Sequence, residues 1–330
     1  MKTLLVCAAA LAAASVPSPA EDCAPLALAA SVDLVPADGG TGELVPVELA
    51  GTHKLLLLDT GGEVSMLSAA AAKELGLKPY SGGMRLSDVT GNSTDRQVTT
   101  ELAIGHLRNP KIRFMVTRED EPMPFDQGVA GILGADILGT LDLSIDFGTH
   151  KLDLLDPRHC EGKVVYWPER PIAVVPFTLI GTAQIVIPVT LDGTELKAYV
   201  DTGASASTIR RPRAERTFGL TMSSAEAPAI GNVNGDKTFT MWRHTFKTLT
   251  LEGITVNNPV FDIIPDRVSG HLAMGAATGT HIDTRDEALE PDILLGMNVL
   301  KHLHVYIAYK EKKLYITPAG TSVPTTSPAK

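Results

Sequence analysis

The sequence predicts an all-β protein built from two similar lobes, and three observations support this. An apolar run enters an Asp-Thr-Gly turn twice, at Asp59-Thr60-Gly61 and at Asp201-Thr202-Gly203. Matching residues continue on both sides of the turns at an offset of 142 positions (201 − 59). The remaining segments include short apolar runs bounded by Gly, Pro and Asn, which are typical of β-strands joined by turns.

The repeat extends over most of the chain. It includes Pro46-Val47 with Pro188-Val189, Gly76-Leu77 with Gly219-Leu220, Val89-Thr90-Gly91-Asn92 with Val233-Asn234-Gly235-Asp236, Asn109-Pro110 with Asn258-Pro259, and 132–138 with 294–300. A solenoid needs about three or more copies of its unit. Two copies of a whole folding unit therefore indicate two lobes.

Both lobes are expected to follow one plan. In the first, residues 44–50 and 54–59 form strands, Ser68 caps a short helix that ends at Gly76, and residues 145–152 form a closing hairpin. Each Asp of an Asp-Thr-Gly turn then lies at the buried end of a strand. Asp is also common in ordinary turns, which is the alternative interpretation. The extended duplication favours a functional pair.

The length of the chain limits the number of domains it can form, and its charge limits the kinds of partner. A chain of 330 residues is long enough for two domains with sizeable cores. A net charge of −9 without a basic patch argues against a nucleic-acid partner. We expect a signal peptide at 1–20, an N-terminal extension at 21–43, lobe one at 44–156, a linker at 157–172, lobe two at 173–318 and a disordered tail at 319–330. A surface loop at 267–290 makes lobe two longer, and it either carries function or is merely tolerated.

The N-terminus has the pattern of a secretory signal peptide. A basic start at Lys2 precedes an apolar run from Leu4 to Ala14, and small residues lead to a cleavage site after Ala20. The run is too short for a typical transmembrane span. Cys7 lies inside it, so lipid attachment there is not expected. We expect an exported protein, periplasmic or secreted, without a stable membrane anchor.

Signal removal leaves two cysteines, Cys23 and Cys160. An even pair in an oxidising compartment predicts a disulfide, and two free buried thiols are the alternative. The bond would join the N-terminal extension to the end of lobe one and close a loop of 137 residues (160 − 23). For a loop of this length the chain-entropy estimate is on the order of 4–5 kcal/mol.

The ordered motifs resemble the retropepsin-like aspartic protease family over roughly residues 44–318: an Asp-Thr-Gly turn after an apolar strand, a hairpin like the family's flap, and two apolar residues with Gly before a closing hairpin. The resemblance implies two closed β-barrel-like lobes with a short helix each, paired within one chain as in pepsin-type members. The same resemblance implies that Asp59 and Asp201 are the catalytic pair. It implies that Thr60 and Thr202 interlock the two loops, and that Gly61 and Gly203 let backbone N–H groups approach the carboxylates. The substrate contacts that it implies in the flap-like segments are Val89, Gly91, Asn92, Val233, Gly235 and Asp236.

Paired carboxyl groups suit peptide hydrolysis without a metal. One carboxylate takes a proton from the attacking water, and the other stays protonated to supply the carbonyl oxygen. Two carboxyls brought close together cannot both ionise cheaply, so the pair keeps one shared proton over an acidic range. This is the established behaviour of aspartic proteases, applied here to Asp59 and Asp201.

The sequence departs from the family at two places. Gly62 stands where the family usually has Ala or Ser, and Ala204 occupies the matching place in lobe two. Neither carries the hydroxyl that pepsin-type enzymes place beside the carboxylate. The flap-like segments 85–102 and 230–242 contain no Tyr, which favours the retropepsin comparison over pepsin.

We therefore expect a monomeric aspartic endopeptidase acting on peptides or proteins, with the lobes paired within one chain. No cofactor or metal is expected, because His302 and His304 lack Cys or Glu partners at metal-site spacing. One alternative is a peptide-binding protein of the same fold that hydrolyses little. Another is an enzyme whose lobes pair between two chains.

Overall fold

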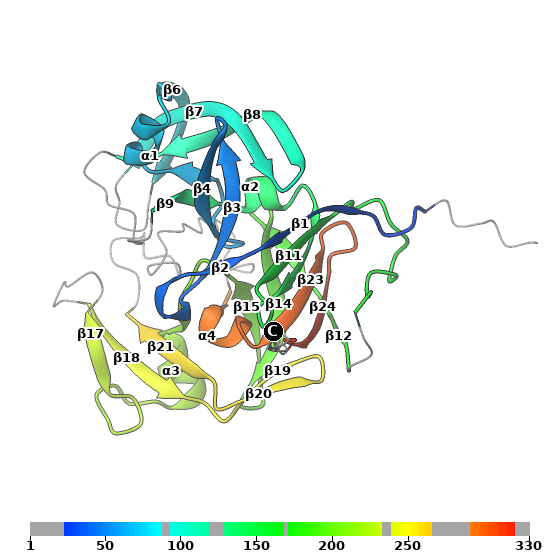
Figure 1. Cartoon of the computed structure of the whole chain (residues 1–330). Coiled ribbons are helices and arrows are strands. Elements are labelled where there is room, and N and C mark those ends of the chain that lie inside the picture. Colours follow the sequence, from blue (N-terminus) through cyan, green and yellow to red (C-terminus); the bar gives the residue numbers. More distant parts are fainter. Residues whose placement is uncertain are drawn as a thin grey trace, which may run out of the picture.

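The computed structural model describes residues 23–87, 93–118, 128–167, 171–232, 239–265 and 291–320. These ranges form mainly β-strands, arranged as two lobes and a further sheet that both lobes share (Figure 1). The expected signal peptide, the six flap-like contacts, the whole 267–290 loop and most of the tail lie outside the described residues. In the part of the chain that is described, no helix is long and apolar enough to cross a membrane.

The first lobe is a closed barrel, the upper body in Figure 1. Its strand order is β2-β3-β4-β9-β5-β8-β7-β6, and additional pairing of β3 with β7 closes the ring. Its elements are β2 (Val35–Pro36), β3 (Glu43–Leu49), β4 (Thr52–Leu58), β5 (Met66–Leu67), α1 (Ala69–Glu74), β6 (Tyr80–Ser87), β7 (Ser93–Ile104), β8 (Leu107–Val116), β9 (Val129–Leu133) and α2 (Ala135–Leu138).

The second lobe repeats this order. Its sheet runs β17-β18-β21-β16-β22-β15-β14-β19-β20, with β13 also paired to β14. The two strands β18 and β19 take the places of the single β7, because β19 pairs with β14 as β7 pairs with β3. The elements are β13 (Thr178–Ile180), β14 (Gln184–Leu191), β15 (Thr194–Val200), β16 (Ser207–Arg210), α3 (Arg211–Phe218), β17 (Ala229–Asn232), β18 (Thr240–Thr245), β19 (Thr248–Leu251), β20 (Ile254–Asn257), β21 (Val260–Ile264), β22 (Ile293–Leu295) and α4 (Met297–Leu300).

The first hairpin of each lobe shows how the local sequence sets the register. Ala50 and Gly51 join β3 to β4 with φ angles of 49° and 76°, and Asp192 and Gly193 join β14 to β15 with 45° and 81°. Two successive residues with positive φ make the tight turn whose twist matches that of paired strands. This register fixes where β4 and β15 end, and each ends directly before an Asp-Thr-Gly turn.

The predicted helix after Ser68 is confirmed. The Ser68 side chain accepts a hydrogen bond from the Ala71 N–H, and Gly76, with φ of 66°, follows the end of α1. Each lobe also has a second short helix, whereas the sequence predicted one per lobe. Helices α2 and α4 have four residues each, too few to show a helical period in the sequence.

A third sheet joins the lobes. Its order is β1-β11-β10-β23-β24-β12, and it is built mainly from the closing hairpins of the two lobes. Its strands are β1 (Leu28–Asp33), β10 (Asp142–Asp146), β11 (Lys151–Leu155), β12 (Ala173–Pro176), β23 (Leu303–Ala308) and β24 (Lys313–Pro318). The central contact is antiparallel, with Ile145 of β10 opposite Val305 of β23. The lobes are therefore joined by a hydrogen-bonded ladder as well as by the covalent chain.

The N-terminal extension is more ordered than its sequence suggested. Residues 21–43 showed only weak patterning, but β1 pairs with β11 and β2 pairs with β3. A 3-10 turn at Asp38–Gly40 lies between β2 and β3. Both strands occupy sheet edges, so partner strands on one side supply the order that the isolated segment lacks.

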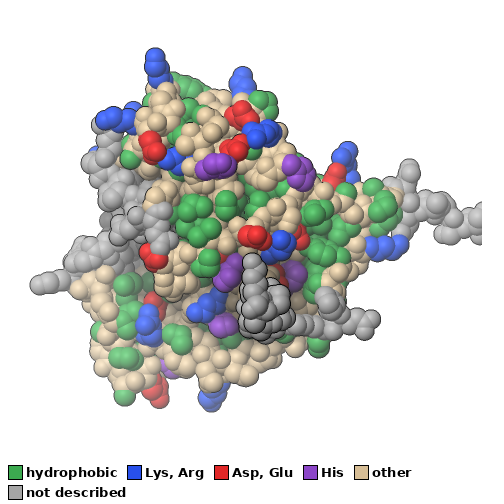
Figure 2. All heavy atoms as spheres, viewed as in Figure 1, with side chains coloured by type: hydrophobic (Ala, Val, Ile, Leu, Met, Phe, Trp, Pro, Cys, Tyr) green, Lys and Arg blue, Asp and Glu red, His purple; other side chains and the backbone are tan. Residues whose placement is uncertain are grey.

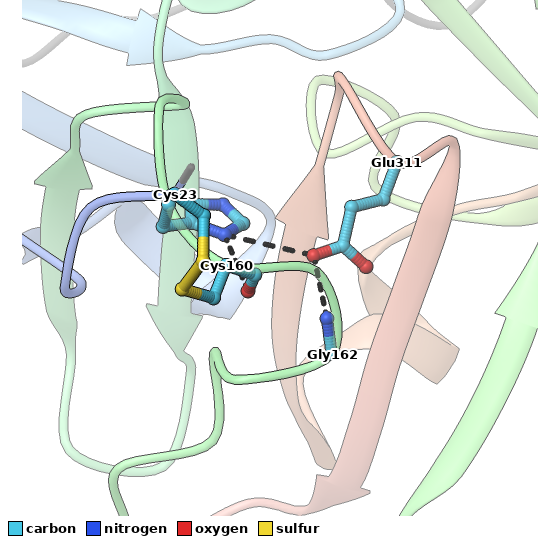
Figure 3. The surroundings of a disulfide bond; sticks show 5 residues. Cys23, Cys160, Gly162 and Glu311 are labelled. Atoms are coloured by element: carbon cyan, nitrogen blue, oxygen red, sulfur yellow. Dashed lines mark hydrogen bonds and ion pairs between the residues drawn. A yellow bond between two sulfur atoms is a disulfide. The ribbon is translucent and has the colours of Figure 1, made fainter. Parts of the chain in front are cut away.

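The predicted disulfide is confirmed. Cys23 and Cys160 are bonded (Figure 3), and their Cα atoms lie 4.8 Å apart. The Cys160 N–H donates to the Ala24 carbonyl. Beside the bond, Glu311 from the turn between β23 and β24 accepts a hydrogen bond from the Gly162 N–H. Residues from the extension, the end of lobe one and the last hairpin therefore meet at this place.

Candidate active site

Two strands deliver the two Asp-Thr-Gly turns to one place between the lobes. Strand β4 lies parallel to β9, and β15 lies parallel to β22. Just beyond the ends of these strands, the Asp59 N–H donates to the Leu133 carbonyl at 3.1 Å and the Asp201 N–H donates to the Leu295 carbonyl at 3.0 Å. The two apolar residues before Gly in each lobe therefore support the turn.

The glycines after those apolar pairs are required by close approach. A Cβ atom at Gly134 would lie 2.8 Å from the Val64 carbonyl carbon, and one at Gly296 would lie 2.6 Å from the Ala206 carbonyl carbon. Real Cβ atoms do not come this near to backbone, so any larger residue would push the segment away from its turn.

Four supporting polar residues were not identified from the sequence. Ser65 Oγ accepts from the Gly134 N–H and donates to Asp136 Oδ1 at 2.7 Å. In lobe two, Ser207 Oγ accepts from the Gly296 N–H and donates to Asn298 Oδ1 at 2.8 Å. The repeat contained the signal, because both members of each pair occupy matched positions within it.

The two threonines interlock the turns. Thr60 Oγ1 donates to the Val200 carbonyl at 3.0 Å, and Thr202 Oγ1 donates to the Leu58 carbonyl at 2.7 Å. Each hydroxyl also accepts from the other threonine's N–H, at 3.0 and 3.1 Å. All four of these hydrogen bonds are buried. This reciprocal set holds the two carboxyl-bearing turns in a fixed relation.

The backbone N–H groups hold one oxygen of each carboxyl group. Asp59 Oδ1 accepts from Gly61 and Gly62 at 2.9 and 2.7 Å. Asp201 Oδ1 accepts from Gly203 and Ala204 at 2.9 and 3.1 Å. Apart from a proton that the two carboxyl groups can share, both Oδ2 atoms lack a donor among the described residues. The free oxygens are thus the ones available for chemistry.

Each carboxyl group also lies against the opposite turn. A Cβ atom at Gly203 would be 2.5 Å from Asp59 Cγ, and one at Gly61 would collide with the Asp201 carboxyl. The two carboxyl groups are within hydrogen-bonding reach of each other. Glycine at these two positions is therefore what allows the carboxyl groups to meet.

Burial and mutual repulsion favour a protonated pair. Both Asp residues are 0% exposed. Burial raises the pKa of Asp59 to about 6, although hydrogen bonds from Asp201, Gly62 and Gly61 act to lower it. Burial first, and then the negative charge of Asp59, raise the pKa of Asp201 well above its usual range. The pair therefore keeps a proton at pH values where isolated carboxyl groups are ionised.

The Gly62 departure has a direct structural counterpart. A Cβ atom at Gly62 would lie 2.8 Å from Asp59 Oδ2. Ala204, at the matching place in lobe two, does carry a Cβ atom and is buried. Asp59 Oδ2 therefore lies where a side chain at position 62 would stand, whereas position 204 already carries a Cβ atom.

Comparison with known proteins places the chain in a family. The sequence matches the family described as aspartyl protease over residues 45–137 and 187–299, which together make up more than half of the chain. The chain therefore belongs to the aspartyl protease family. The two matched regions correspond to the two lobes, as expected from the internal repeat. Among curated proteins, no sequence matches.

Several solved structures resemble the chain, and the one with a TM-score above 0.5 supports the fold. A protein described as edgp has a TM-score of 0.51 at 8% identity, covering 89% of this chain and 95% of its own. An aspartic proteinase from Irpex lacteus has a TM-score of 0.49 at 15% identity, covering 90% and 99%. Basic 7S globulin from soybean has 0.46 at 9% identity, covering 89% and 95%. At such identities the likeness concerns the fold alone, so activity has to be argued from the site.

Proposed function

We propose that the protein is an aspartic endopeptidase that hydrolyses peptide bonds with a water activated between Asp59 and Asp201. The observation that carries this proposal is the paired geometry of the two carboxyl groups: each is fixed through Oδ1 by two backbone N–H groups, and each has a free Oδ2. A pair that served only as turn residues would not need to meet across two lobes at complete burial.

The proposed reaction uses the two carboxyl groups in different states. Asp59, as carboxylate, takes a proton from the water while the water oxygen bonds to the peptide carbonyl carbon. Asp201 gives its proton to the carbonyl oxygen, which forms a neutral tetrahedral intermediate. Asp59 then passes a proton to the leaving nitrogen as the C–N bond breaks, and Asp201 recovers its proton from a hydroxyl of the intermediate.

The remaining parts of the proposal concern partners and location. The shared sheet joins two lobes of one chain, which supports a monomer acting on a peptide or protein substrate. On the face shown in Figure 2, basic and acidic side chains are interspersed, which supports a partner other than nucleic acid. The disulfide supports an exported protein, because such bonds form mainly in oxidising compartments.

A peptide-library digestion tests the proposal. Wild type and the variants Asp59→Asn and Asp201→Asn are incubated with mixed peptides, and the products are identified by mass spectrometry. We expect cleavage by wild type and a loss of at least a thousandfold in either variant. The matched control is Asp33→Asn, which removes an exposed carboxylate that pairs with Lys151. Equal cleavage by all four proteins would contradict the assignment of the pair.

A second function is favoured by one observation, the complete burial of both carboxyl groups. A substrate carbonyl must displace whatever covers them, and a protein that keeps them covered would bind peptides without turnover. Calorimetry with the same peptides separates the two functions. Affinity without product at any pH, in a folded protein, would favour the peptide-binding function.

A further inference from the structure

The two halves of the site differ at one carbonyl group. The Gly61 carbonyl oxygen accepts two hydrogen bonds from lobe two, from Tyr199 Oη at 2.5 Å and from Gln184 Nε2 at 3.1 Å. Both donors are buried, and Tyr199 has no exposed surface. Sequence reasoning placed neither residue in the site.

The matched positions of lobe one offer no counterpart of this arrangement. At the repeat offset of 142, Gln184 matches Gly42 (184 − 142) and Tyr199 matches Leu57 (199 − 142). Neither glycine nor leucine has a side-chain donor, so these positions cannot supply the same hydrogen bonds to the Gly203 carbonyl. The internal symmetry of the fold is therefore broken beside the pair of carboxyl groups.

The two donors are held in place by their surroundings. The Tyr199 ring packs with Ile180, Val186 and Leu294 in a buried apolar cluster. The Gln184 side chain lies against Gly181, where an added Cβ atom would collide with Oε1. Burial, followed by the negative charges of Asp201 and Asp59, raises the pKa of Tyr199 well above its usual range. The hydroxyl therefore remains a donor.

The Gly61 carbonyl belongs to the same peptide unit as the Gly62 N–H. That N–H donates to Asp59 Oδ1 at 2.7 Å, whereas the corresponding Ala204 N–H donates to Asp201 Oδ1 at 3.1 Å. Hydrogen bonds to a carbonyl polarise its peptide and strengthen the bond that the N–H of the same unit makes. A stronger donor favours the charged form of the carboxyl group that accepts it.

We propose that Tyr199 and Gln184 are positioning residues that make Asp59 the carboxylate and leave the proton on Asp201. This inference rests on the proposed function for its meaning in the reaction, because it assigns the base and the acid. The two hydrogen bonds to the Gly61 carbonyl, which the matched positions of lobe one cannot supply, carry this inference.

The test is the pH profile of kcat/KM for Tyr199→Phe and for Gln184→Met, each of which removes one donor. We expect the acid limb, which reports ionisation of Asp59, to move to higher pH. At pH values below the acid limb, kcat/KM of each variant should be about three- to tenfold lower than that of wild type, as expected for the loss of one net hydrogen bond. At pH values above the limb, the difference from wild type should be small. A uniform loss at every pH would overturn the proposal and leave a structural role.

Two controls accompany these variants. Tyr309→Phe removes another buried tyrosine hydroxyl, one without a partner among the described residues, and should leave the acid limb in place. Besides Asp201 and Asp59, the charge of Glu63 acts on Tyr199. The variant Glu63→Gln removes that charge, so that a shift of the acid limb can be assigned to Asp59. An equal shift in Tyr309→Phe would contradict the assignment.

A second readout keeps this inference separate from the proposed function. Infrared titration of the protonated carboxyl band, with Asp59→Asn to assign it, follows the ionisation of Asp59 without substrate. If wild type does not cleave peptides, the proposed function fails while this titration still decides the inference. A higher midpoint in either folded variant supports it, and an unchanged midpoint in both overturns it.

Discussion

At the scale of single residues, the site depends on side chains that are absent, as at Gly62, as well as on those that are present. Asp59 and Asp201 are identical in sequence context over three residues, yet Gly62 and Ala204 give them different neighbours. The sequence located the two carboxyl groups and their threonines, because these repeat. It could not show which carboxyl group is the proposed base and which the acid. That proposal rests on Tyr199 and Gln184, which occupy positions where the repeat does not match.

The buried pair should make stability depend on pH. The folded-state pKa of Asp59, about 6, lies above its ordinary value of 3.8. The stabilisation that protonated Asp59 gives the folded protein is therefore complete below about pH 4 and is lost as pH rises through 6. Such a shift corresponds to a loss on the order of 3 kcal/mol in the free energy of unfolding. Urea denaturation between pH 4 and 7 measures this decline. Asp59→Asn/Asp201→Asn should flatten the decline, and an unchanged slope would contradict the buried-pair assignment.

The space beside Asp59 should matter for rate. Gly62→Ala would bring a Cβ atom to 2.8 Å from Asp59 Oδ2, which forces the carboxyl group to rotate. We expect kcat to fall about ten- to a hundredfold, as displacements of this size do in active sites. Steady-state kinetics measures it. The matched change Ala204→Gly adds space and should have a smaller effect, so equal losses in both would argue against a role for this asymmetry.

At the scale of elements, strands β4 and β15 are buried at their C-terminal ends and stop directly before the Asp-Thr-Gly turns. The repeat predicted these strands and the apolar pair before each supporting glycine. The four-residue helices α2 and α4 and the edge strand β1 were missed, because their order comes from contacts with distant strands. Local sequence patterns do not contain such contacts.

The threonine interlock should be cooperative. Thr60→Val leaves the Val200 carbonyl and the Thr202 N–H without their buried partners, and Thr202→Val does the same to Leu58 and Thr60. Each change should cost about 2–4 kcal/mol of unfolding free energy, and the double variant less than the sum, because both act on one network. Urea titrations complete the cycle.

Thr208→Val is the control for the interlock. Thr208 is also buried, but its hydroxyl has no hydrogen-bond partner among the described residues. Its replacement should cost less than 1 kcal/mol, because no buried group loses a partner. Strict additivity of the two threonine changes in the interlock would show that the turns are held independently.

At the scale of the whole molecule, the shared six-stranded sheet is the feature that the sequence did not predict. Each closing hairpin was identified within its own lobe, but nothing in either hairpin shows that β10 pairs with β23. A buried core cluster runs through both lobes and this sheet, with Leu56 and Val305 among its members. The Asp-bearing turns thus face each other across a joined core. The domain boundaries given above stay predictions.

The disulfide should stabilise the whole molecule. Cys23→Ser/Cys160→Ser opens a loop of 137 residues, and we expect a loss of roughly 4–5 kcal/mol in the free energy of unfolding. The loss comes mainly from greater freedom of the unfolded chain. Chemical denaturation of the variant against oxidised wild type measures it. A loss below about 1 kcal/mol would contradict this chain-entropy account of the bond.

The central claim is that Asp59 and Asp201 together hydrolyse peptide bonds, and its most direct test is the pH dependence of cleavage. With the best peptide from the library, kcat/KM is measured from pH 3 to 8 for wild type, Asp59→Asn and Asp201→Asn. We expect a bell-shaped profile for wild type with its acid limb near pH 6, and no cleavage by either variant. Cleavage that survives the loss of either carboxyl group, or a folded wild type without activity at every pH, would contradict the claim.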